Sequence, residues 1–160
     1  MSDSTSEPRA GGQTGSPSEV LQQDETQAYT YVTAAFYAAL VVGIGVTALL
    51  HDALAPSTGF GASPGATWTT SAQFYAPIVA GAAGFYAGND LDGQRAYLSS
   101  FVGNAVGYLI LFLGAYMIND VLLDLGGGDI EIAMQVGIAA GIGVTGVLFA
   151  YVADNYEDYT

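Results

Sequence analysis

The chain has 160 residues, of which 51% are hydrophobic and only 11% are charged. Soluble globular domains carry about 25% charged residues, so this composition indicates an integral membrane protein. The charge is one-sided, with 15 acidic residues against two arginines and no lysine. Because nucleic-acid binding needs a basic patch, this balance argues against a nucleic-acid partner.

The first 27 residues are rich in Ser, Thr, Gly, Pro, Gln and acidic side chains. Such a segment buries too little apolar surface to offset the entropy lost on folding. We therefore expect a disordered cytoplasmic tail over residues 1–27, and a short acidic tail over residues 154–160.

Four apolar runs follow in chain order, at about residues 28–50, 72–88, 96–118 and 132–152. A helix of about 20 apolar residues is long enough to cross the hydrocarbon core of a bilayer. Both faces of these runs are apolar, whereas barrel strands alternate apolar and polar residues. The sequence predicts an all-α, polytopic protein whose residues 28–153 form a bundle of four transmembrane helices in the lipid bilayer.

The two arginines indicate an orientation. Arg9 precedes the first run and Arg95 lies between the second and third, so both fall on one side. The positive-inside rule makes that side cytoplasmic, and we expect a multi-pass cell-membrane protein with both termini inside. Aromatic residues would then mark the inner interface (Tyr29, Tyr31, Tyr86, Tyr97, Tyr151) and the outer one (Trp68, Phe74, Tyr75, Tyr116).

Small residues recur at intervals of four in each run. The four stripes are Ala35, Ala39, Gly43 and Thr47; Ala76, Ala80, Gly84 and Gly88; Ser99, Gly103 and Gly107; and Ala133, Gly137, Gly141 and Thr145. Residues four apart share one helix face, and small side chains let membrane helices approach closely. We expect the stripes to be packing surfaces, although glycine and alanine are also simply common in membrane helices.

The sequence GIGVT occurs twice, at Gly43–Thr47 and at Gly141–Thr145. In the expected topology the first and fourth helices are antiparallel, so these two stripes could face each other. We therefore expect Gly43 and Gly141 to be contact points with another helix of this chain or of a neighbouring subunit, where a larger side chain would push the helices apart.

Polar residues in the third run suggest hydrogen bonds between helices. Asn104 needs a partner at membrane depth, and Gln135 and Tyr108 are the candidates. Such bonds contribute about 0.6–2 kcal/mol each. The same residues, with Ser100, could instead line a permeation path.

The outer ends of the first and third runs look alike, with LHDAL at residues 50–54 and INDVL at residues 118–122. The inner ends of the second and fourth runs read FYAGND and FAYVADN, which suggests a two-plus-two duplication with parallel halves. A duplication would gather His51, Asp52, Asn119, Asp120 and Asp124, whose oxygen ligands suit a hard cation. The alternative is that these residues are solvated helix ends.

The lack of lysine beside an excess of acid resembles the composition of small membrane proteins of halophilic archaea. This resemblance covers the whole chain loosely and implies no site. The chain has no cysteine and contains no GxSxG, HExxH or P-loop motif, so we expect neither an enzyme nor a cofactor.

Two functions remain. The first is a membrane scaffold or accessory subunit, which associates with itself or with a membrane protein through its small-residue stripes. The second is a passive channel or small-solute carrier with a weakly polar lining. The spans carry no charged residue, which weakens the case for an ion-coupled transporter.

Overall fold

The computed structural model describes residues 15–54, 64–122 and 131–156, and only the backbone of residues 51–54, 64–73, 119 and 122. The elements are α1 (Pro17–Leu21), α2 (Asp24–Leu54), α3 (Pro64–Asp90), α4 (Gly93–Met117), the π-helical turn η1 (Ile118–Leu122) and α5 (Ile132–Asp154). The described part of the chain is all helical, as the sequence predicts.

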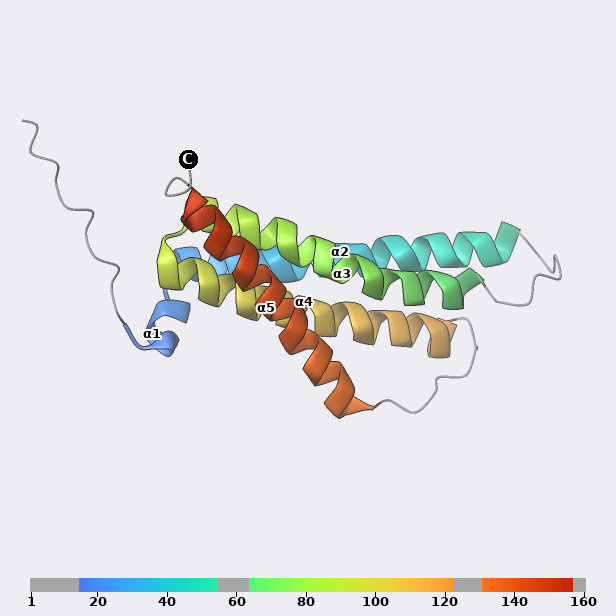
Figure 1. Ribbon diagram of the computed structural model, residues 1–160. Coiled ribbons are helices and arrows are strands. Elements are labelled where there is room, and N and C mark those ends of the chain that lie inside the picture. The colour runs from blue at the N-terminus through green and yellow to red at the C-terminus, as the bar shows by residue number, and fades with distance from the viewer. Residues whose placement is uncertain (1–14, 55–63, 123–130, 157–160) are drawn as a thin grey trace, which may run out of the picture.

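Helices α2, α3 and α4 lie lengthwise beside one another, and α5 crosses them obliquely (Figure 1). One end of the bundle, called here the proximal end, holds the start of α2, the turn between α3 and α4, and the end of α5. Helix α2 packs mainly on α4, whereas α3 packs mainly on α5 and α4 packs on both α2 and α5. Helices α2 and α5 are therefore not neighbours.

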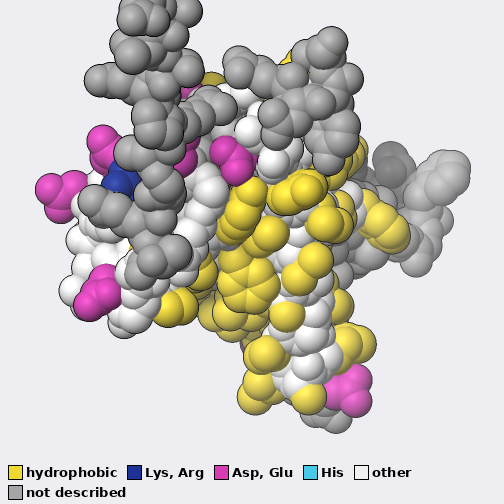
Figure 2. Space-filling model, turned by 60° about the vertical axis from the view of Figure 1, so that its left-hand side comes forward, with side chains coloured by type: hydrophobic (Ala, Val, Ile, Leu, Met, Phe, Trp, Pro, Cys, Tyr) yellow, Lys and Arg dark blue, Asp and Glu magenta, His cyan; other side chains and the backbone are white. Residues whose placement is uncertain are grey.

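Three helical segments are long and apolar enough to cross a membrane: Asp24–Leu50, Gly93–Met117 and Ile132–Asp154. Helix α3 is not among them within the residues whose side chains are described, so the fourth span stays a prediction. Large apolar side chains are also exposed over the helices, as the yellow surface in Figure 2 shows. An apolar surface of this extent requires a membrane or a protein partner to cover it.

The structure places helices inside the segment for which we expected disorder. Residues 1–14 lie outside the described part of the chain, but α1 and the first turn of α2 fall within residues 15–27. Pro17 begins α1, and the Ser16 backbone N–H donates to the Glu19 carboxylate at 2.9 Å. Both features favour a helix start, and Val20 is buried where α1 packs on α4.

Candidate functional site

Helices α3 and α5 approach each other to backbone contact. A Cβ atom added to Gly84 would overlap the carbonyl oxygen of Gly146, and one added to Gly88 would overlap that of Ala150. Ala76 and Ala80, from the same stripe of α3, have no exposed surface. The stripe that we expected on α3 therefore lies inside the bundle, where only glycine permits such an approach.

Helix α4 uses its stripe against α2. Gly107 lies under the ring of Tyr37, and Gly103 lies against Thr33 with 3.0 Å between the Thr33 Cβ and the position that a Cβ of Gly103 would take. Ser99 is likewise buried. Gly103 and Gly107 thus each receive a larger side chain of α2, which lets the two helices approach closely.

The small-residue stripes of α2 and α5, by contrast, lie mostly on the outer surface of the bundle. Ala35, Ala39, Gly43 and Thr47 are exposed, as are Ala133, Gly137 and Gly141, whereas Thr145 is half-buried. A Cβ added to Gly43, Gly137 or Gly141 would meet nothing within 4 Å. Our expectation that Gly43 and Gly141 contact another helix within the bundle is wrong, and the two stripes do not face each other. A contact of these glycines with a neighbouring subunit stays a prediction.

The reason is that α2 and α5 pack on opposite sides of the other helices and bury a neighbouring face. In both copies of GIGVT the second glycine is the buried one. Gly45 lies against the Ile118 side chain, and a Cβ on Gly143 would lie 3.0 Å from the carbonyl oxygen of Phe101. The repeat is therefore a packing element, but its inward residue is the glycine two positions later than we expected.

The threonine of each repeat has a local role. The Thr47 hydroxyl donates to the carbonyl oxygen of Gly43 at 2.8 Å, and the Thr145 hydroxyl donates to that of Gly141 at 3.0 Å. A bond to the carbonyl four residues earlier satisfies a hydroxyl without a partner helix. Threonine can thus occupy an apolar surface of either helix.

The buried polar groups form two pairs. The Tyr37 hydroxyl lies 3.2 Å from the Asn104 side-chain oxygen and 3.1 Å from the Ala76 carbonyl oxygen, so it joins α2, α3 and α4. The Tyr108 hydroxyl donates to the Gln135 side-chain oxygen at 2.8 Å and joins α4 to α5. Asn104, Tyr108 and Gln135 are therefore all bonded between helices, but Asn104 pairs with Tyr37 rather than with Tyr108 or Gln135.

Sequence reasoning missed Tyr37. Its signal is the series Thr26, Thr30, Thr33 and Tyr37, in which polar residues recur at helical spacing on one face of α2. That face, and not the stripe of small residues, packs on α4.

Three buried side-chain atoms have no hydrogen-bond partner in the described part of the chain: the Gln23 amide oxygen and the hydroxyls of Thr26 and Ser100. Ser100 lies beside Asn104, which donates to the Ser100 carbonyl oxygen at 2.8 Å. Polar groups thus occur in the core from the proximal end of α2 to the start of α5.

Two similar tyrosine–aspartate pairs lie at the proximal end. In the first pair the Tyr29 hydroxyl of α2 donates to the carboxylate of Asp90, which ends α3, and the Tyr29 ring lies 6.3 Å from that of Tyr86. In the second pair the Tyr97 hydroxyl of α4 donates to Asp154, which ends α5, at 2.7 Å, and the Tyr97 ring lies 6.1 Å from that of Tyr151. Each pair ties the start of one long helix to the end of the next.

These pairs occupy matching positions in the two halves of the chain. An asparagine next to each aspartate also bonds the carbonyl four residues earlier: Asn89 to Phe85 at 3.0 Å, and Asn155 to Tyr151 at 2.8 Å. The order of the two residues differs, since Asn89 precedes Asp90 whereas Asn155 follows Asp154, and α4 packs more extensively on α5 than α2 packs on α3. The two-plus-two duplication therefore stays a prediction.

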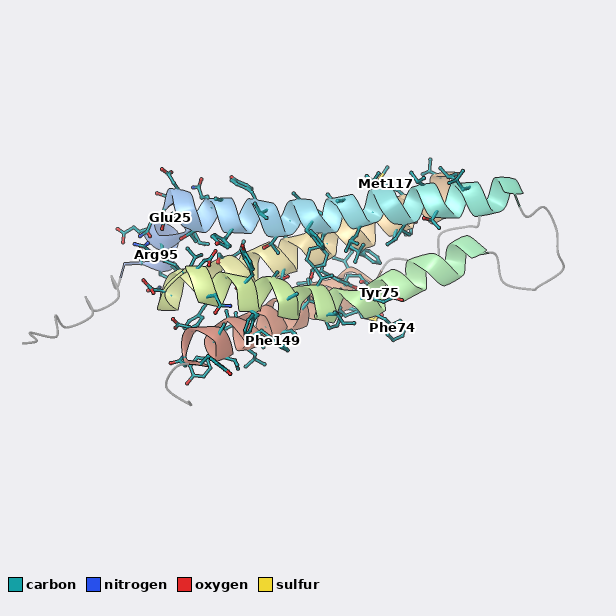
Figure 3. The ribbon with its side chains drawn as sticks, turned by 90° about the horizontal axis from the view of Figure 1, so that it is seen from above. Glu25, Phe74, Tyr75, Arg95, Met117 and Phe149 are labelled. Carbon is teal, nitrogen blue, oxygen red and sulfur yellow. The ribbon has the colours of Figure 1, made fainter. Side chains whose placement is uncertain are left out.

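The proximal end is acidic. Its basic side chain within the described residues, Arg95, lies 3.2 Å from the Glu25 carboxylate (Figure 3). Figure 2 shows acidic side chains gathered around a single basic one at the end that comes forward. Arg95 and four of the five tyrosines expected at the inner interface, Tyr29, Tyr86, Tyr97 and Tyr151, therefore lie at one end of the bundle.

The expected cation cluster falls largely outside the described side chains. Those of His51, Asp52, Asn119 and Asp124 are not described, whereas Asp120 lies in η1. The cation site stays a prediction. Comparison of the chain with models of protein families, with curated proteins and with solved structures finds no match.

Proposed function

We propose that this protein is an integral membrane scaffold or accessory subunit, with α3 as its fourth span and its proximal end in the cytoplasm. Three apolar helices of membrane-spanning length and an apolar lateral surface support insertion. Arg95 and the interfacial tyrosines at the proximal end support the orientation.

One observation carries the scaffold role. After the bundle has packed, two helix faces still present small residues outward, here called the open faces: Ala35, Ala39 and Gly43 on α2, and Gly137 and Gly141 on α5. Faces of this kind let a helix of a second copy, or of another membrane protein, approach closely. Since α2 and α5 are not neighbours, the two open faces could serve two partners at once.

Purification in a mild detergent tests this role. We expect an oligomer or a stoichiometric membrane-protein partner, and we expect Gly43→Leu combined with Gly141→Leu to remove it while the helix content stays unchanged. Val106→Leu, which adds bulk to the exposed surface of α4, is the control. A monomer without a partner, or an assembly that both glycine variants leave intact, would contradict the proposal.

The orientation has its own test, because the chain lacks cysteine. A Gly12→Cys variant should resist membrane-impermeant thiol reagents applied to intact cells and react after the membrane is opened. Labelling from outside would reverse the proposed orientation.

A passive channel or small-solute carrier is the second candidate. The buried line of polar residues favours it, in particular the unpartnered Ser100 hydroxyl beside Asn104. Solute flux into liposomes that disappears in an Asn104→Leu variant would support this function over the scaffold role.

A further inference from the structure

A groove of about 550 Å³ runs between α2 and α3 along the proximal half of the bundle. Its walls are apolar and include Val32 and Phe36 of α2, and Ile78 and Ala82 of α3. These four side chains are exposed on the lateral surface. The groove therefore opens sideways, toward the surroundings of the bundle, and not toward its core.

The groove follows from how the helices pair. Helix α2 packs mainly on α4 and α3 packs mainly on α5, so α2 and α3 contact each other less than either contacts its main partner. Hydrogen bonds close the gap at two places, between Tyr29 and Asp90 at the proximal end and between Tyr37 and the Ala76 carbonyl oxygen deeper in the bundle. Small side chains between these places, such as Ala82, leave the groove open.

The distance between the two closures limits the occupant. Tyr29 and Tyr37 are eight residues apart, which corresponds to about 12 Å of helix. Volumes of about 300–1,000 Å³ with apolar walls and few polar groups are typical of sites for small molecules.

The charge at the proximal end of the groove selects among lipids. The charged groups at the proximal ends of the two groove helices are Asp24 and Glu25 of α2 and Asp90 of α3, and Arg95 of α4 pairs with Glu25. This excess of carboxylate repels an anionic headgroup and attracts an ammonium group. We propose that the α2–α3 groove binds the hydrocarbon chain of a membrane lipid whose headgroup carries an ammonium group beside Asp90.

This inference rests on the proposed membrane insertion, and its test is separate. The protein is reconstituted in nanodiscs of equimolar phosphatidylcholine and phosphatidylglycerol, and the retained lipid is counted by native mass spectrometry after release into detergent. We expect about one phosphatidylcholine per chain, retained at least five-fold over phosphatidylglycerol. Ala82→Phe and Val32→Trp, which fill the groove from opposite walls, should each lower retention at least five-fold.

Two further variants complete the design. Val106→Trp, on the exposed surface of α4, adds the same bulk as Val32→Trp outside both the groove and the open faces and should leave retention unchanged. Asp90→Asn should reduce the preference for phosphatidylcholine while hydrocarbon binding remains. Lipid retention in both filled variants equal to that of the unmodified protein, a preference for phosphatidylglycerol, or loss of a dimer instead of a lipid on filling the groove would overturn the inference. A protein that inserts and assembles but retains no lipid would refute this inference alone.

Discussion

The interface between α3 and α5 and the open faces of α2 and α5 contain the same kind of residues at the same spacing, in opposite environments. Gly84 touches the backbone of Gly146, whereas Gly43 and Gly141 have no neighbour within 4 Å of an added Cβ. A stripe of small residues therefore makes a helix face able to receive another helix, but the rest of the bundle decides whether a helix of the same chain lies there.

The largest effect is expected from a variant that disrupts the close contact between α3 and α5. Gly84→Leu should lower the free energy of unfolding by about 3 kcal/mol, at the upper end of overpacking effects, because the new side chain meets backbone that cannot rotate away. Gly43→Leu is the matched control and should change it by less than about 0.5 kcal/mol. Equilibrium unfolding of a monomeric preparation in mixed micelles measures both, and equal losses would remove the distinction between the two regions.

The next effect concerns the hydrogen bonds that hold the inward faces together. Tyr37→Phe keeps the ring over Gly107 but removes the hydroxyl that bonds Asn104 and Ala76. We expect a loss of about 1 kcal/mol in unfolding free energy, the usual size for such bonds between membrane helices. Tyr31→Phe is the control because Tyr31 is 68% exposed, and a similar loss there would show that the buried bond contributes nothing.

The two tyrosine–aspartate pairs allow a comparison between the halves of the chain. Tyr29→Phe and Tyr97→Phe each remove a hydroxyl that donates to an aspartate at a helix end. Each should lower the unfolding free energy by about 0.5–1 kcal/mol, and the two losses should be alike. A loss of unfolding free energy at Tyr97 with none at Tyr29, measured in the same micelles, would show that the two pairs do not stabilise the halves of the chain equally.

The smallest effect lies outside the bundle, at the start of α1. The hydrogen bond from the Ser16 backbone N–H lowers the pKa of Glu19. A lowered pKa in the folded state means that this contribution is present at neutral pH and is lost as the pH falls through the lowered pKa. The protection factor of the Ser16 amide, which is its NMR exchange rate relative to the intrinsic rate at the same pH, should fall at low pH, whereas a Glu19→Gln variant should show no such pH dependence.

Much of the fold follows from the sequence, because runs of about 20 residues that are apolar on both faces are too long and too uniform for strands and favour helices. The stripes of α3 and α4 also lie where their spacing places them, inside the bundle. The stripes of α2 and α5 do not, because spacing shows which residues share a face and leaves open which face meets a neighbour.

The polar residues contain the information that the small residues lack. On α2, the line from Thr26 to Tyr37 marks the face that packs on α4, since buried polar groups need partners. On α5, Gln135 marks the inward face in the same way, and it leads through Ala139 and Ile142 to Gly143 and Gly146. The choice of Tyr37 as the partner of Asn104 depends on which helices are neighbours, and the sequence does not show this.

The most direct test of the account compares two glycines of one repeat, Gly141 and Gly143. Leucine at either position adds the same volume and the same helix propensity, so only the surroundings differ. Gly143→Leu must displace Phe101 and should lower the unfolding free energy by about 1–3 kcal/mol, whereas Gly141→Leu in a monomeric micelle preparation should change it by less than about 0.5 kcal/mol. A larger loss at Gly141 than at Gly143 would contradict the assignment of the inward and outward faces of α5.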